Sequence, residues 1–146
     1  MRASSRGSRA TIYRVLLRVV GLAVGALFIY ASLDKIAHPD RFADIVHEYD
    51  LLPLLFINAF ALTMPWVEMV AGVGLILGLW RRAAGLIATA LTLAFLFAIA
   101  SAEIRGLDIE CGCFDVSGMS ATEATWDLFA RDIALLLGCV VVWRKG

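Results

Sequence analysis

Two cysteines one residue apart, Cys111 and Cys113, are the residues of this sequence best suited to chemistry. Gly112 lies between them and gives the backbone the freedom to bring both sulfur atoms together. A disulfide that closes so small a ring is strained, and strained, exposed disulfides are the labile and reactive kind. Because such a bridge removes little chain entropy, it is a poor structural staple. The pair favours thiol–disulfide exchange, with a structural bridge or two inert thiols as the alternatives.

A second candidate for chemistry is a carboxylate inside an apolar stretch. Glu68 lies about ten residues into residues 59–79, near the middle of a bilayer if that stretch is a membrane-spanning helix. A carboxylate at that depth is costly unless it is protonated or paired, so we expect Glu68 to face the interior of a helix bundle. It could form a structural ion pair with Lys35 or Arg131, or it could handle protons or contact a ligand beside a quinone.

Further charged residues are expected to gather with Glu68 near one side of the membrane. Asp34 and Lys35 end one apolar stretch, and Arg131 and Asp132 lie in the first half of another. Neighbours on a helix point to different sides, so Arg131 and Asp132 are expected to find partners on other helices. These five residues form a predicted polar site for a quinone or for protons. Helix–helix association through polar contacts is the alternative.

A metal centre is a weaker interpretation. His38 and His47 would lie on the same side of the membrane as Cys111 and Cys113, but the spacing of the histidines fits no zinc motif. We therefore expect no metal site. The third cysteine, Cys139, lies within an apolar stretch and is typical of a small buried residue.

Four apolar stretches must position these residues. Of the 146 residues 61% are apolar and 18% charged, whereas a soluble domain is about 45–50% apolar and about 25% charged. A bilayer core of about 30 Å requires about 20 helical residues to cross it. The predicted spans are residues 12–33, 59–79, 83–103 and 124–143. The last span is the weakest, because Asp127, Arg131 and Asp132 lie in its first half. A three-helix protein with a peripheral tail is the alternative.

The distribution of charge predicts the orientation. Arginines crowd residues 1–18 and recur at Arg81, Arg82 and Arg144, whereas most acidic residues fall on the other side of the four predicted spans. By the positive-inside rule, both termini are then cytoplasmic, and the cysteine pair faces the opposite, oxidising side of the membrane. Residues 1–10 are expected to form a disordered basic tail, and residues 11–146 a single membrane domain.

The first outer loop is predicted to contain a short amphipathic helix. Phe42, Ile45, Val46 and Tyr49 recur at helical spacing between two prolines that are typical start and stop signals. Such a helix would lie on the outer surface of the membrane. The predicted fold is an all-α membrane protein, a four-transmembrane-helix bundle with a short interfacial helix in its first outer loop.

Several segments together resemble a known family. They are Tyr30–Lys35, His38–Phe42, Tyr49–Pro53, Pro65–Glu68, Arg82–Ala84, Cys111–Phe114, Trp126 and Arg131–Asp132. Over residues 15–143 the sequence resembles the DoxX-like membrane proteins, and its Cys-Gly-Cys-Phe stretch resembles their methylamine-utilisation branch, MauE. Asp115 stands where that branch often has glycine.

This resemblance implies a four-helix membrane bundle that supports maturation of a periplasmic methylamine dehydrogenase, whose small subunit is rich in disulfides. It also implies a thioredoxin-like protein as partner. Wider relatives include subunits of thiosulfate:quinone oxidoreductases.

The residues and the resemblance together predict a membrane thiol–disulfide redox protein. Cys111 and Cys113 would cycle between dithiol and disulfide, and the cofactor suggested by the polar site is a quinone. The zero net charge gives no indication of a nucleic acid partner. The alternatives are a DoxX-type subunit of a quinone-linked oxidoreductase complex, a non-enzymatic membrane scaffold, and a small transporter that uses Glu68.

Overall fold

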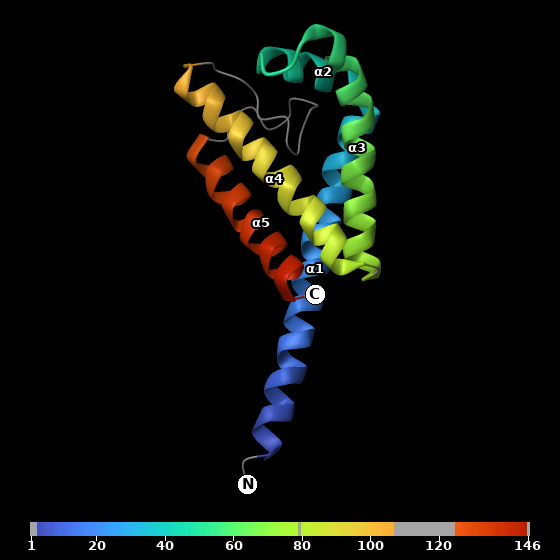
Figure 1. Ribbon diagram of the computed structural model, residues 1–146, viewed down its shortest axis with the longest axis vertical. Coiled ribbons are helices and arrows are strands. Elements are labelled where there is room, and N and C mark those ends of the chain that lie inside the picture. Colours follow the sequence, from blue (N-terminus) through green and yellow to red (C-terminus); the bar gives the residue numbers. More distant parts are fainter. Residues whose placement is uncertain (1–2, 79, 107–124, 146) are drawn as a thin grey trace.

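Helices make up the regular structure of the described chain, as the predicted all-α class requires. The computed structural model describes residues 3–78, 80–106 and 125–145. Its helices are α1 Ala3–Ala37, α2 Pro39–Glu48, α3 Leu54–Leu77, α4 Arg81–Ile104 and α5 Thr125–Lys145. The four long helices pack as two pairs, α1 with α3 and α4 with α5, and α2 lies across one end (Figure 1).

Three of the described helices are long and apolar enough to cross a membrane. They are Thr11–Ala37 within α1, all of α3 and all of α4. Large apolar side chains on these helices point outwards, among them Leu27, Leu62 and Phe97, as expected of surfaces that face lipid. The chain is therefore a multi-pass membrane protein. α5 overlaps the fourth predicted span but is not among the three, so a four-span bundle stays a prediction.

α1 is longer than its predicted span at both ends. It continues through Asp34 and Lys35 beyond residue 33 and ends before Pro39, because a proline ring disfavours a helical conformation of the residue before it. At the other end it includes residues 3–10, for which the sequence predicted a disordered tail. This first part of α1 projects away from the other helices (Figure 1).

The bounds of α3 differ from the predicted 59–79. The helix begins directly after Pro53, at Leu54, since nothing in the following residues opposes a helix. It ends at Leu77 because Gly78 adopts the left-handed conformation, with φ of 70°, that commonly terminates helices.

α1 and α3 pack so closely that their backbones meet at two glycines. A Cβ atom on Gly25 would lie 2.7 Å from the carbonyl oxygen of Gly72, and a Cβ atom on Gly72 would lie 2.8 Å from the carbonyl oxygen of Gly25. Small residues at crossings are typical of membrane helices, whose association depends on close packing. The crossing therefore fixes which faces of α1 and α3 meet.

α5 packs against α4 and α1 along its apolar half. A Cβ atom on Gly85 of α4 would lie 2.9 Å from the backbone nitrogen of Trp143, and one on Gly138 would lie 3.1 Å from Val24 of α1. One buried cluster joins α1, α3, α4 and α5 through Val24, Phe28, Leu75, Ala84, Ala88, Leu135, Cys139 and Val142. α5 is thus part of the same bundle as the three apolar helices.

α2 covers the end of the bundle where α1 ends and α3 begins (Figure 1). The side chains that the sequence grouped on its apolar side are buried in a second cluster, against residues of α3 and α4: Phe42, Ile45, Val46 and Tyr49. This side of α2 therefore packs on protein. Its predicted position on the membrane surface stays a prediction.

Candidate functional site

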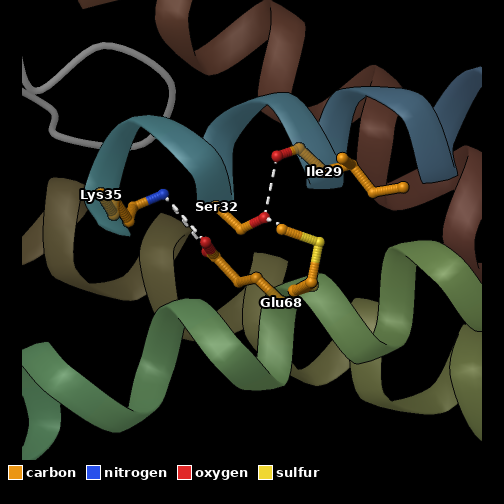
Figure 2. A network of polar contacts seen from close by, with 5 residues as sticks. Ile29, Ser32, Lys35 and Glu68 are labelled. Atoms are coloured by element: carbon orange, nitrogen blue, oxygen red, sulfur yellow. Dashed lines mark hydrogen bonds and ion pairs between the residues drawn. The ribbon is translucent and has the colours of Figure 1, made fainter. Parts of the chain in front are cut away.

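A buried ion pair joins α1 and α3 inside the bundle. Lys35 Nζ lies 3.1 Å from Oε2 and 3.4 Å from Oε1 of Glu68 (Figure 2). The side chain of Lys35 is 0% exposed and that of Glu68 is 4% exposed. Of the two cations proposed as partners for Glu68, the structure brings Lys35 into contact with it.

The periodicity of α1 explains why these two residues meet. Ile29, Ser32 and Lys35 recur every third residue and face α3, where Ile29 packs beside Gly72. The Ser32 hydroxyl donates a hydrogen bond of 2.8 Å to the Ile29 carbonyl and lies 3.7 Å from the Met69 sulfur (Figure 2). Lys35 continues the row by one turn and comes opposite Glu68.

Two phenyl rings also lie near the Lys35 ammonium group. Its Nζ lies 5.5 Å from the centroid of Phe42 on α2 and 5.3 Å from that of Phe95 on α4. The faces of aromatic rings attract cations at such distances. One side chain of α1 thus contacts groups on α2, α3 and α4.

A small cavity of about 20 Å³ lies beside the ion pair. Its polar lining comes from Glu68, Thr92 and Asp132, and its apolar lining includes Phe28 and Phe95. A space of at least about 10–15 Å³ can hold a water molecule when two or more polar groups are in reach. The cavity is therefore large enough for one water between the two carboxylates.

Asp132 brings α5 into the same site. It is 2% exposed, and its charge interacts with that of Lys35. Arg131 Nε lies 3.6 Å from Asp132 Oδ1, and the Arg131 side chain is 34% exposed. The sequence predicted partners on other helices for both residues and did not anticipate this contact. A long arginine side chain can turn back towards its neighbour.

Asp34 lies at the edge of the site. Its side chain is 16% exposed, and Oδ1 lies 3.5 Å from Nδ1 of His38, one turn later. Lys35, Glu68 and Asp132 thus form the interior of the polar site, whereas Asp34 and Arg131 lie at its boundary.

Tyr49 approaches the polar site from the connection between α2 and α3. Burial, with smaller contributions from Asp132 and Glu48, raises the pKa of Tyr49 from 10.0 to about 12, so its hydroxyl stays protonated to a higher pH than that of an exposed tyrosine. Arg105, which follows α4, donates a hydrogen bond to the Tyr49 carbonyl. This contact ties the end of α4 to the α2–α3 connection.

The predicted redox pair, Cys111 and Cys113, lies outside the described residues. α4 ends and α5 begins towards the end of the bundle that carries α2 (Figure 1). Cys139 is a free cysteine, 0% exposed, as the sequence predicted for a small buried residue. Within the described ranges, no group of three or more His, Cys, Asp or Glu side chains is placed to hold a metal ion.

Three residues of the site were missed at the level of sequence. Phe42 was assigned only to the apolar side of α2, without a contact to Lys35. Thr92 and Phe95 lie in a stretch without charges, and their only signal is a spacing that puts both on one face of a helix.

The described helices define a class: an all-helical, multi-pass membrane protein with a buried polar site shared by its helices. Residues 13–144 match the family described as methylamine utilisation protein MauE. The chain therefore belongs to the MauE family.

Curated relatives agree with this assignment. The chain is 33% identical over 125 residues to a methylamine utilization protein MauE of Paracoccus denitrificans, covering 85% of this chain and 66% of that protein. It is 35% identical over 108 residues to the protein of that name from Methylorubrum extorquens, covering 73% and 57%. For the Methylophilus methylotrophus protein the identity is 36% over 93 residues, covering 63% and 49%. The chain thus spans about half to two thirds of the length of these relatives. No solved structure is significantly similar.

Proposed function

We propose that this chain is a bacterial inner-membrane thiol–disulfide redox protein that supports maturation of a periplasmic partner in methylamine utilisation. Cys111 and Cys113 are its redox pair, and the polar site within the bundle handles the accompanying protons or holds a quinone. The observation that carries the proposal is the buried Lys35–Glu68 pair beside a cavity that Asp132 also lines. The family to which the chain belongs, named for methylamine utilisation, supports the biological setting.

The polar site contains more ionisable groups than helix association requires. A buried ion pair contributes little net stability, because desolvation of both charges offsets their attraction. Here a third buried group, Asp132, and a cavity accompany Lys35 and Glu68. Ionisable residues inside membrane helices typically mark substrate, ion or proton pathways. Reactions of thiols and quinones move protons together with electrons, so such a site suits them.

The proposed exchange takes place between Cys111 and Cys113 and a cysteine pair of the partner, and its electrons and protons balance. A thiolate of one pair attacks a sulfur of the other pair's disulfide and forms a mixed disulfide, which the second thiolate resolves. One disulfide breaks and one forms, and two electrons and two protons pass between the chain and its partner. When a quinone restores the disulfide of Cys111 and Cys113, it accepts the same two electrons and two protons and becomes a quinol.

The proposal makes α5 the fourth span and places both termini in the cytoplasm. Its support is the packing of α5 on α4 and α1, the burial of Asp132, and the exposed apolar residues Ile133, Leu137 and Val141. A reporter that is active only in the cytoplasm, fused after Gly146, should be active. Activity only of a periplasmic reporter at that position would contradict the four-span topology.

Trapping of a mixed disulfide tests the redox function. In intact cells, Cys113→Ser should leave Cys111 able to attack a partner, but no second thiol remains to release it. A covalent complex that dithiothreitol reduces should therefore accumulate. Cys139→Ser is the matched control, because Cys139 is buried, and it should behave like the wild type. If neither Cys111→Ser nor Cys113→Ser traps a partner and both leave maturation intact, the chain acts as a scaffold instead.

A further inference from the structure

Arginines from three helices gather at the end of the bundle opposite α2. We call this set of residues the arginine end. It comprises Arg14 and Arg18 of α1, Arg81 and Arg82 of α4, and Arg144 of α5. All are exposed except Arg81, which is half-buried. Figure 1 shows the end of α3, the start of α4 and the end of α5 at this end of the bundle.

Contacts between α4 and α5 bring two of these groups together. A Cβ atom on Gly85 would lie 2.9 Å from the backbone nitrogen of Trp143. Arg81 and Arg82 lie one turn before Gly85, and Arg144 directly follows Trp143. The arginines at the start of α4 and at the end of α5 therefore lie at the same height along the bundle axis.

Contacts between α1 and α3 place Arg18 at the same height along the bundle axis. A Cβ atom on Gly21 would lie 3.6 Å from the carbonyl oxygen of Leu75. The two helices are antiparallel, so Arg18, three residues before Gly21, comes level with Gly78, three residues after Leu75. The guanidinium of Arg81 already lies over Gly78, with Nε 2.9 Å from the position of a Cβ atom there.

No acidic residue offsets these charges from within the chain segments that form this end. Residues 1–33, 69–102 and 133–146 contain no Asp or Glu. Arginines that converge without an acid repel one another and raise the local positive potential. This end of the bundle should therefore attract an anion from outside the chain.

We propose that the arginine end binds the phosphate headgroup of an anionic phospholipid. Guanidinium groups bind phosphate oxygens bidentately, and basic pockets between membrane helices are typical headgroup sites. Trp80 and Trp143 are exposed beside the arginines, where indole rings favour the membrane interface. Leu77 and Leu86, also exposed, offer an apolar surface to the acyl chains. This site is independent of the redox proposal, because it shares no residue with the polar site or the cysteines.

Lipid retention tests the site. The full chain is reconstituted in vesicles of phosphatidylcholine that contain phosphatidylglycerol, and co-purified lipids are counted by native mass spectrometry. The wild type should be enriched in phosphatidylglycerol relative to the vesicle. Each arginine near a membrane surface favours anionic lipid by about fivefold, so Arg81→Gln with Arg82→Gln should lower the enrichment by more than tenfold.

Arg41→Gln is the matched control, since Arg41 is an exposed arginine on α2, at the other end of the bundle. It should leave the enrichment unchanged, and Arg144→Gln should lower it about fivefold. Helical content by circular dichroism verifies that each variant is folded. If the double variant Arg81→Gln with Arg82→Gln is not folded, Arg144→Gln alone decides the result. Equal retention of both lipids by the wild type, an equal loss in Arg41→Gln, or displacement of the lipid by inorganic phosphate alone would each overturn the proposal.

Discussion

Gly25 and Gly72 set the register between α1 and α3. Neither residue could carry a methyl group at the present helix separation, because its Cβ atom would lie 2.7 or 2.8 Å from the carbonyl oxygen of the other. From this contact the facing row of α1 runs through Ile29 and Ser32 to Lys35, which meets Glu68 at 3.1 Å. The ion pair therefore depends on a glycine contact that lies about three turns away along α1 and about one turn away along α3.

Replacement of Gly25 should weaken this register. Gly25→Ala forces the two backbones apart, and overpacking of this kind typically costs about 1–3 kcal/mol. Gly21→Ala is the matched control on the same helix face, because its Cβ atom would lie at an ordinary contact distance of 3.6 Å from Leu75. Reversible unfolding in mixed micelles should show a loss for Gly25→Ala and little change for Gly21→Ala. Equal losses would mean that the glycine contact does not set the helix separation.

Removal of one member of the ion pair should cost more than removal of both. Lys35→Met leaves Glu68 buried without its cation, and loss of one partner of a buried pair typically costs about 3–5 kcal/mol. The double variant Lys35→Met with Glu68→Leu replaces both charges by apolar groups and should recover most of that loss. A double-mutant cycle of unfolding free energies measures the coupling.

The same double variant separates structure from function. If the pair serves only stability, a folded double variant should still support maturation of the partner. If the pair handles protons or a quinone, the double variant should be stable and inactive, as the proposed function expects.

Patterns of residue type predicted much of the fold. Long apolar stretches led to three helices that could span a membrane, and the spacing of Phe42, Ile45 and Val46 identified the buried side of α2. The ends of α1 and α3 were predicted less accurately. Hydropathy shows where a run of apolar residues ends, whereas a helix can continue beyond that point. Lys35 lies inside α1 although it ends the apolar run, since its charge is satisfied by a partner that is distant in sequence.

The candidate site could be predicted only in its charged members. A charge in or beside an apolar stretch requires a partner. For this reason the sequence identified Glu68 and Lys35 as members of the site and as a possible ion pair. Phe95 and Thr92 carry no such requirement and look like any residue of an apolar helix. Their place beside Glu68 depends on how α4 is rotated against α3, which is a property of the packing of the whole bundle.

Cys139 should report on opening of the bundle. In a variant with Cys111→Ser and Cys113→Ser it is the remaining thiol of the chain, and it is 0% exposed in a cluster shared by four helices. A maleimide should therefore label it slowly under native conditions and rapidly after denaturation. Gly25→Ala should speed native labelling, because it loosens the same bundle, whereas Gly21→Ala should not. Rapid native labelling in the otherwise intact protein would contradict the packing of α5.

Arg105 should hold α2 against the end of α4 through its hydrogen bond to the Tyr49 carbonyl. Arg105→Gln removes this bond, at a cost of about 1 kcal/mol for a partly exposed contact. The backbone amides of α2 that follow Pro39 should then exchange with deuterium faster, while those in the middle of α3 keep their rates. Glu103→Gln, an exposed substitution at the same helix end, serves as control. An unchanged exchange rate in α2 would show that the buried apolar side of α2 suffices to hold it.

Tyr49 should make stability depend on alkaline pH. Burial raises its pKa from 10.0 to about 12, so below pH 10 the phenol is protonated in both the folded and the unfolded state and its contribution to stability is fully present. Above pH 10 the unfolded state loses this proton first, and stability should fall as pH rises towards 12, by up to about 2–3 kcal/mol. Tyr49→Phe cannot ionise, so its unfolding free energy should fall less over the same interval. Unfolding titrations of the two proteins at matched pH values measure the difference, and parallel curves would show that the Tyr49 hydroxyl is not in an environment that resists ionisation.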